Sequence, residues 1–249
     1  IVLVSFTVAN VVNYYVISHD YEIQIRNNHR VFASVLASNI GQFIQNAYNI
    51  TEDIALNSDI VSFDGDRQKK VLVDAFKRFP FFEILYVQKT DGNQTAKSAG
   101  ALAYRGDRWW FKKFMNDRKP FVSKSYYSVA GDMTVTSIYC GVYEGDKLLG
   151  IVGADLKLDA LQKMVENFSI GQDSYAYVLD GEGTVIAHPD KKQVTEVTNY
   201  KTLKKTVLVK DAQGNIKKDE KGNQVTAEQD IQVPDGLKVI TEKALKGET

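Results

Sequence analysis

A single helical pattern spans the first part of the chain and constrains its fold most strongly. Between residues 18 and 57 the apolar residues recur every three or four positions, which places them on one stripe of a helix. The stripe consists of Phe32, Leu36, Ile40, Phe43, Ala47, Ile50 and Ile54. Gly41 is the only glycine in this segment, and no proline ends the helix early. We expect residues 18–57 to form one stalk helix about 55 Å long, far longer than the helices of ordinary globular domains.

The residues before the stalk are uncharged. Residues 1–17 contain no Asp, Glu, Lys or Arg, and Tyr14 and Tyr15 near their end suit a membrane–water interface. As a helix they would be about 25 Å long, which is the lower limit for a membrane span. Asn10 and Asn13 interrupt the apolar run. We expect the outer end of a transmembrane helix here, with a buried core helix as the alternative.

After residue 57 the pattern changes to short strands and helices. A helix is predicted at residues 66–79, where Pro80 ends it. Strands are predicted at residues 82–88, 121–127, 133–143 and 148–156, and short helices at residues 108–116 and 158–168. The sequences Asp91-Gly92 and Glu144-Gly145 between strands are typical of hairpins. Residues 58–168 are therefore predicted to form one module built on an antiparallel sheet.

A second unit repeats the opening of the first. The stretch AYVLDGEGTVIA from Ala176 resembles LYVQKTDGNQTA from Leu85 in its strand–turn–strand pattern. A helix, a charged stretch with turns at residues 213–215 and 221–223, and a final helix from about residue 237 follow. No further strands are predicted, so we expect residues 169–249 to form a second module that is incomplete at its C-terminus.

Composition excludes several classes of protein. The 31 basic and 31 acidic side chains give a net charge of zero, which a nucleic-acid-binding protein would not have. One cysteine and three scattered histidines exclude a disulfide framework and argue against a metal centre. The sequence contains no nucleophile elbow, phosphate-binding loop or metalloprotease helix. We expect no enzymatic activity, no cofactor and no metal.

Three stretches carry a family resemblance. They are the Arg-Trp-Trp-Phe run at residues 108–111, the apolar run at residues 149–155 that ends in Asp155, and YVLDGEGTVIAHPD at residues 177–190. In their order and spacing they resemble the double Cache (dCache) extracytoplasmic sensor domain of bacterial chemoreceptors, sensor kinases and diguanylate cyclases. The resemblance implies an α+β fold: a long N-terminal stalk helix followed by two tandem PAS-like modules with antiparallel sheets flanked by helices. Residues 58–168 would be the membrane-distal, ligand-binding module, and residues 169–249 the membrane-proximal one.

The resemblance also implies a binding site. One subset of the family binds L-amino acids through a motif that Arg108, Trp110, Phe111, Tyr126 and Asp155 match here. The chain departs from that motif at three places: Tyr104 lies four residues before the arginine instead of five, Phe111 lacks the hydroxyl often present, and Ser128 stands where an aspartate is frequent.

These residue types suit a free amino acid, which carries a carboxylate and an ammonium on one carbon. The planar guanidinium of Arg108 can bind the carboxylate through two hydrogen bonds. Asp155 can accept hydrogen bonds from the ammonium, and Tyr126 and Ser128 can add hydroxyls. Tyr126 and Tyr127 are adjacent in a strand and must face opposite sides, so we expect Tyr126 to face inward. The alternative is a structural salt bridge between Arg108 and Asp155.

The functional hypothesis is a ligand-binding sensor domain of a bacterial transmembrane receptor, most simply a methyl-accepting chemotaxis protein. It would lie in the inner or plasma membrane with the sensor domain periplasmic or extracellular, and it would signal across the membrane. Two alternatives stay open: the same fold binding an amine, a purine or an organic acid, and a module that senses a partner protein with no small ligand. The stalk helix also offers a surface for a homodimer.

Overall fold

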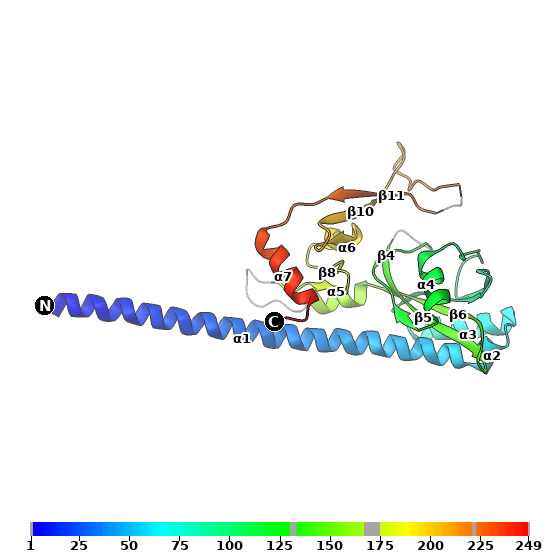
Figure 1. Ribbon diagram of the computed structural model, residues 1–249, viewed down its shortest axis with the longest axis horizontal. Helices are drawn as coiled ribbons and strands as arrows, with labels where there is room; N and C mark the ends of the chain where they lie inside the picture. The colour runs from blue at the N-terminus through cyan, green and yellow to red at the C-terminus, as the bar shows by residue number, and fades with distance from the viewer. Residues whose placement is uncertain (1, 130–132, 167–174, 221–222, 249) are drawn as a thin grey trace.

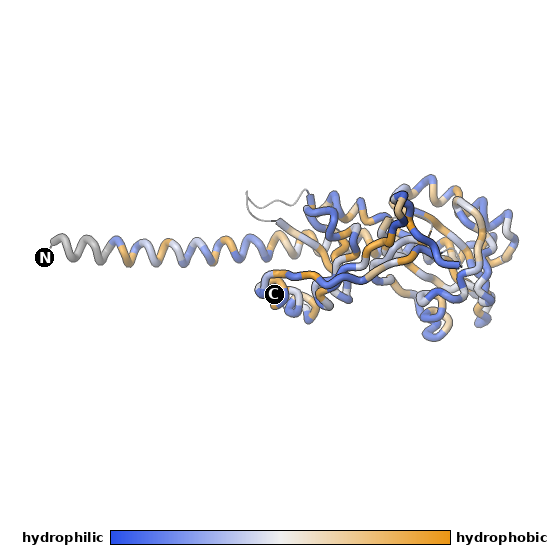
Figure 2. Tube along the Cα trace, turned by 90° about the horizontal axis from the view of Figure 1, so that it is seen from above, coloured by the Kyte–Doolittle hydropathy of each residue, from blue (hydrophilic) through white to orange (hydrophobic). Residues whose placement is uncertain are grey.

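The computed structural model describes residues 2–129, 133–166, 175–220 and 223–248, without the side chains of residues 2–9. Helix α1 (Val2–Leu56) is continuous over 55 residues. Both modules pack against its C-terminal part, and its N-terminal part extends beyond them (Figures 1 and 2). Leu36 and Ile40 lie in the core of the second module, whereas Ala47 and Ile54 lie in the core of the first. The predicted apolar stripe therefore serves two separate cores.

Within the part of the chain that the structure describes, no helix combines the length and the apolar character needed to cross a membrane.

The first module is a six-stranded antiparallel sheet flanked by helices on both faces. The strand order is β2-β1-β6-β5-β3, and β4 also pairs with β5. Its elements are α2 (Ser58–Val61), α3 (Gly65–Arg78), β1 (Phe82–Lys89), β2 (Gln94–Lys97), α4 (Trp109–Asp117), β3 (Phe121–Val122), β4 (Tyr126–Tyr127), β5 (Thr134–Glu144) and β6 (Lys147–Lys157). Helix α5 (Asp159–Glu166) follows β6, and its Leu161 and Val165 lie in the core of the second module together with Leu36 and Ile40.

Side chains alternate between the two faces of this sheet, as the period of a strand requires. On β1, Leu85 and Val87 pack toward α1 and α3, whereas Ile84 and Tyr86 pack toward α4. The strand predicted at residues 121–127 is two short strands, because Ser125 leaves the ladder and donates its backbone N–H to Asp180 Oδ2 (3.0 Å) in the second module. The face covered by α4 holds the candidate site.

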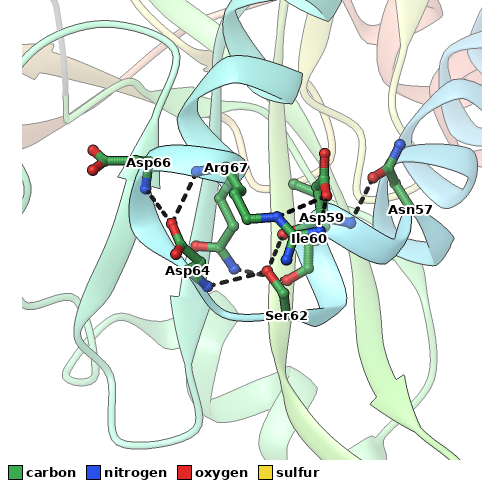
Figure 3. Close-up of polar contacts among 8 residues, drawn as sticks. Asn57, Asp59, Ile60, Ser62, Asp64, Asp66 and Arg67 are labelled. Atoms are coloured by element: carbon green, nitrogen blue, oxygen red, sulfur yellow. Dashed lines mark hydrogen bonds and ion pairs between the residues drawn. The ribbon is translucent and has the colours of Figure 1, made fainter.

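Helices α2 and α3 join α1 to the sheet through a network of caps (Figure 3). Asn57 caps α2 by accepting a hydrogen bond from the backbone N–H of Asp59 (2.9 Å). Asp64 caps α3 by accepting from the backbone N–H of Arg67 (3.0 Å), and the guanidinium of Arg67 pairs with the carboxylate of Asp59. The otherwise unpaired N–H groups at both helix starts are thereby satisfied.

The second module contains a two-stranded sheet, β7-β8, and a three-stranded sheet, β11-β10-β9. Its elements are β7 (Val178–Leu179), β8 (Val185–Ala187), α6 (Lys191–Thr195), β9 (Thr198–Asn199), β10 (Lys204–Leu208), β11 (Thr226–Asp230) and α7 (Asp235–Leu245). Strands β10 and β11 lie where the sequence predicts only a charged stretch with turns. Strand β11 is largely exposed and β10 is mostly half-buried, and neither alternates apolar and polar residues, so periodicity gave no signal for them.

Residues 209–220 and 223–225, between β10 and β11, are here called the arm. The backbone N–H of Val209 donates to the carbonyl oxygen of Val225 (2.9 Å), and that of Lys217 donates to the carbonyl oxygen of Val209 (2.8 Å). Within the arm, the backbone N–H of Asn215 donates to Asp211 Oδ1 (2.9 Å) and that of Asn223 donates to Asp219 Oδ1 (2.7 Å). The arm reaches toward the first module (Figure 1).

Candidate ligand-binding site

Asp155 is the buried acidic group of the first module. It lies on β6 in register with Ile84 of β1 and Ser137 of β5, and its side chain is 5% exposed. The hydroxyl of Ser137 donates to Asp155 Oδ1 (2.7 Å), and among the described residues no basic side chain forms an ion pair with this carboxylate. Burial, and secondarily the nearby carboxylate of Glu83, raise the pKa of Asp155 to about 7.

A chain of hydroxyl groups continues from Asp155. The hydroxyl of Tyr126 lies 2.7 Å from Ser137 Oγ and 2.9 Å from the hydroxyl of Tyr139. The hydroxyl of Tyr86 donates to that of Tyr139 at 3.5 Å. Burial raises the pKa of all three tyrosines well above the usual value of 10, so they remain neutral hydrogen-bond donors at physiological pH.

Trp110 packs its ring against one of these tyrosines. It is 2% exposed, and its ring stacks on Tyr139 with centroids 4.8 Å apart and planes at 12°. Its indole Nε1 is buried and has no hydrogen-bond partner among the described residues. An unmet buried donor is rare in folded proteins, and here it is available to an acceptor on a ligand.

These groups line an inner cavity of about 60 Å³. Its lining residues are Ile84, Tyr86, Gln94, Lys97, Arg105, Trp110, Tyr126, Val129 and Asp155. Lys97 and Arg105 are basic residues of the same lining that contains the acidic Asp155. Burial lowers the pKa of both, and each is lowered further by a neighbouring arginine: Arg105 beside Lys97, and Arg108 beside Arg105. The lining of the inner cavity therefore contains ionisable groups of both charge signs.

The structure brings together only part of the predicted site. Trp110, Tyr126 and Asp155 line the inner cavity. Tyr126 faces inward, as strand alternation predicts, whereas the hydroxyl of Tyr127 contacts the carbonyl oxygens of Thr195 and Thr206 in the second module (2.6 and 2.9 Å). No ion pair joins Arg108 to Asp155 in the described part of the chain, so the salt-bridge alternative is not what the structure shows.

The remaining predicted residues lie around the inner cavity rather than in its lining. Phe111 is buried behind Trp110, with ring centroids 6.3 Å apart. Ser128 is fully buried and donates its hydroxyl to Glu83 Oε1 (3.0 Å). Tyr104 is 56% exposed. Arg108 is the N-cap residue of α4, and its Nη1 donates to Asn223 Oδ1 (3.2 Å) in the arm.

Lys97 and Arg105 are the basic residues of the inner cavity, and neither was predicted from the sequence. Lys97 ends the polar strand β2, and Arg105 lies in the irregular segment between β2 and α4. The one signal available was local charge, because residues 97–108 contain three basic residues and one acidic residue. That signal does not say which basic side chain enters a cavity.

A second, larger cavity of about 570 Å³ lies between the modules. Arg108, Trp109 and Lys124 line it from the first module, and Glu182 and Asn223 from the second. Lys124 Nζ lies 5.5 Å from the centroid of the Trp109 ring and 3.2 Å from Glu182 Oε2. Tyr126 and Val129 line both cavities, so the inter-module cavity adjoins the inner one.

No group of three or more His, Cys, Asp or Glu side chains in the described ranges is placed to hold a metal ion.

Comparison with known families decides the classification. Residues 17–243, nearly the whole chain, match the family described as a Cache domain. The chain belongs to the Cache domain family. The predicted double Cache resemblance and the predicted α+β fold, with a long N-terminal helix and antiparallel sheets, are thereby confirmed.

Several curated relatives of this Cache domain are methyl-accepting chemotaxis proteins. The chain is 24% identical over 206 residues to the methyl-accepting chemotaxis protein PscA of Pseudomonas syringae pv. tomato, covering 80% of this chain and 32% of that protein. It is 23% identical over 200 residues to the methyl-accepting chemotaxis protein McpG of Pseudomonas putida, covering 78% of this chain and 30% of that protein. The Cache domain thus spans about a third of the length of these relatives.

Solved structures share the fold. The ligand-binding domain of the Pseudomonas fluorescens chemoreceptor CtaA in complex with L-serine has a TM-score of 0.57 at 22% identity, covering 71% of this chain and 81% of that one. The ligand-binding domain of the Campylobacter jejuni chemoreceptor Tlp3 in complex with L-valine has a TM-score of 0.55 at 16% identity, covering 70% and 74% of the two chains. At these identities the likeness concerns the fold alone.

Proposed function

We propose that the chain is the extracytoplasmic sensor domain of a bacterial methyl-accepting chemotaxis protein and that its inner cavity binds a small L-amino acid. The observation that carries the proposal is the pairing of a buried carboxylate, Asp155, with Lys97 and Arg105 in the lining of one cavity of about 60 Å³. A free amino acid presents the complementary pair of charges on a single carbon, and the small volume favours a short side chain.

Each charged end of such a ligand has suitable partners. The ammonium would donate to Asp155 and to the hydroxyl oxygen of Tyr126. The carboxylate would accept from Arg105 and Lys97, from the unmet Nε1 of Trp110, and from Arg108 once its guanidinium turns from the inter-module cavity. Charge-assisted hydrogen bonds contribute about 1.5–3 kcal/mol each, so three or four of them, less the cost of ordering the ligand, give micromolar affinity.

The relatives support the receptor class. PscA and McpG are methyl-accepting chemotaxis proteins, and the ligand-binding domains of CtaA and Tlp3 were solved in complex with L-serine and L-valine. In the whole receptor, residues 1–17 would belong to the membrane anchor, residues 18–57 to the stalk, residues 58–168 to the membrane-distal module and residues 169–249 to the proximal one. The sensor domain would lie in the periplasm or outside the cell, without enzymatic activity of its own.

A homodimer through α1 belongs to the same proposal. The N-terminal part of α1 exposes large apolar side chains beyond both modules, among them Tyr14, Tyr15, Tyr21 and Val31. Two such helices from two copies would cover one another's apolar surface.

The function is tested by a thermal-shift screen of the 249-residue chain. The panel contains the L-amino acids, small amines, purines and organic acids. A ligand present at a hundred times its Kd stabilises the folded state by about 2.7 kcal/mol, which raises the melting temperature measurably. We expect small L-amino acids to raise it. A shift with amines alone would contradict the amino-acid assignment, and no shift with any compound would favour a module that senses a partner protein.

The carboxylate side of the cavity gives a separate prediction. Replacing Arg105 by alanine is expected to weaken amino-acid binding at least about tenfold, because a partly buried guanidinium no longer meets the carboxylate. Isothermal titration calorimetry measures the change. Lys112→Ala is the matched control, because Lys112 is an exposed basic residue on α4 outside both cavities. Equal affinity in the Arg105 variant and the control would exclude Arg105 from the site.

A further inference from the structure

Arg108 lies between the two cavities with an incomplete set of partners. Its Nη1 donates to Asn223 Oδ1, whereas its Nε is buried and has no hydrogen-bond partner among the described residues. The guanidinium is also close enough to the inner cavity to affect two lining residues: its charge opposes the rise in the pKa of Tyr86 that burial causes, and it adds to the lowering of the pKa of Arg105 by burial. Arg108 therefore contacts the second module, while its charge acts on residues of the inner cavity in the first module.

Two hydrogen bonds to Asp219 hold Asn223. Its backbone N–H donates to Asp219 Oδ1 (2.7 Å) and its Nδ2 donates to Asp219 Oδ2 (3.1 Å). These two bonds fix the side-chain amide, so its Oδ1 is free to accept from Arg108 across the inter-module cavity. This bond joins residues 115 positions apart in sequence and links the arm of the second module to the binding face of the first.

Asn215 offers a matched control for Asn223. Residues 211–215 and 219–223 both read Asp-x-x-Gly-Asn, and each asparagine donates its backbone N–H and its Nδ2 to the aspartate four residues earlier. Asn215 is exposed, and its hydrogen bonds in the described structure all lie within residues 211–215. The two asparagines thus share these two bonds, but among them only Asn223 contacts Arg108.

We propose that Asn223 is a positioning residue for the ligand site: it holds Arg108 in the inter-module cavity, and a ligand carboxylate competes with it for the guanidinium. The inference rests on the proposed function, because it requires a ligand with a carboxylate in the inner cavity. It deepens that function by assigning a role to the second module. Binding would release the contact between the arm and the first module, and by reciprocity this contact would lower the affinity for the ligand.

The sign of the effect follows from this competition. Removing the Asn223 side-chain oxygen frees Arg108 for the carboxylate, so Asn223→Ala is expected to bind about threefold to tenfold more tightly than the wild type. Asn223→Asp replaces a neutral acceptor by a charged one, which holds a guanidinium more strongly, so this variant is expected to bind more weakly by at least the same factor. Damage to the turn alone would not give effects of opposite sign.

The experiment is calorimetric titration of the 249-residue chain with L-serine and L-valine, two probes of different side-chain size. The variants are Asn223→Ala, Asn223→Asp, Asn215→Ala and Asn215→Asp, each made in the wild-type background and with Arg108→Ala. The Asn215 variants are expected to leave affinity unchanged, and the effects of the Asn223 variants are expected to disappear when Arg108 is alanine. Thermal melts confirm that each variant is folded.

Two outcomes would overturn the inference alone. In the first, the wild type binds the probe but Asn223→Ala binds it with equal or weaker affinity. In the second, the Asn223 variants still change the affinity when Arg108 is alanine. Failure of the wild type to bind either probe would overturn both the inference and the amino-acid assignment, so the two failures are distinguishable.

Discussion

Replacing Asp155 by asparagine is expected to weaken amino-acid binding about a hundredfold or more while leaving the domain folded. The ligand ammonium would enter a buried site whose only acidic lining residue is Asp155 among those described, and a neutral amide does not balance its charge. Removing one member of a buried, hydrogen-bonded charge pair typically costs about 2–5 kcal/mol. Calorimetric titration of the amino acid selected by the thermal-shift screen measures the loss.

The same substitution has little reason to unfold the protein. Asparagine has nearly the shape of aspartate, and its side-chain oxygen can still accept the hydrogen bond from Ser137. Asp146→Asn is the matched control, because Asp146 is an exposed carboxylate at the β5–β6 turn. Unchanged affinity in Asp155→Asn would remove Asp155 from the ammonium site.

Ligand affinity is also expected to depend steeply on pH. Because the pKa of Asp155 is about 7 in the unliganded site, this carboxyl is largely protonated at pH 6, and an ammonium ligand must displace the proton. Affinity should therefore rise about tenfold per pH unit below pH 7 and level off above it. Calorimetry in buffers of different ionisation enthalpy should detect about one proton released per ligand at pH 6. A flat affinity profile between pH 6 and pH 8 would contradict this expectation.

The free energy of unfolding of the unliganded protein should depend on pH in the opposite sense to ligand affinity: the contribution of Asp155 falls as pH rises. A carboxyl whose pKa is higher in the folded state than in the unfolded state holds its proton more tightly when folded. Its favourable contribution is therefore lost as pH rises from about 4 to about 7. The charged groups that face Asp155 are Glu83 on β1 and Lys97 on β2, and burial shifts the pKa of each toward its neutral form. In Asp155→Asn the part of the pH dependence that Asp155 contributes should disappear.

Periodicity accounts for the parts of the fold that the sequence predicted. The spacing of Leu36, Ile40, Ala47 and Ile54 predicted one long helix, because burial against both modules leaves apolar residues on one face. Alternation within β4 predicted that Tyr126 faces inward. Strands β10 and β11 were missed because neither strand alternates apolar and polar residues.

The site was predicted less completely for a related reason. Trp110, Tyr126 and Asp155 lie on regular elements, whose geometry fixes where the side chains point. Arg105 lies in a segment without periodicity, so its entry into the inner cavity depends on a chain path that no local pattern encodes. The contact between Arg108 and Asn223 joins two modules, and the local sequence around Arg108 contains no pattern that predicts it.

Because two cores share α1, the number of residues between their contact points on this helix is constrained. Ile40 belongs to one core and Ala47 to the other, and the interval between them is close to two helical turns, so both residues face the same side. One residue inserted in this interval would rotate the two sets of apolar side chains apart by about 100°. The two modules therefore keep a fixed rotational position around α1. A rotation or translation of α1 at one core also moves the α1 side chains that pack in the other core.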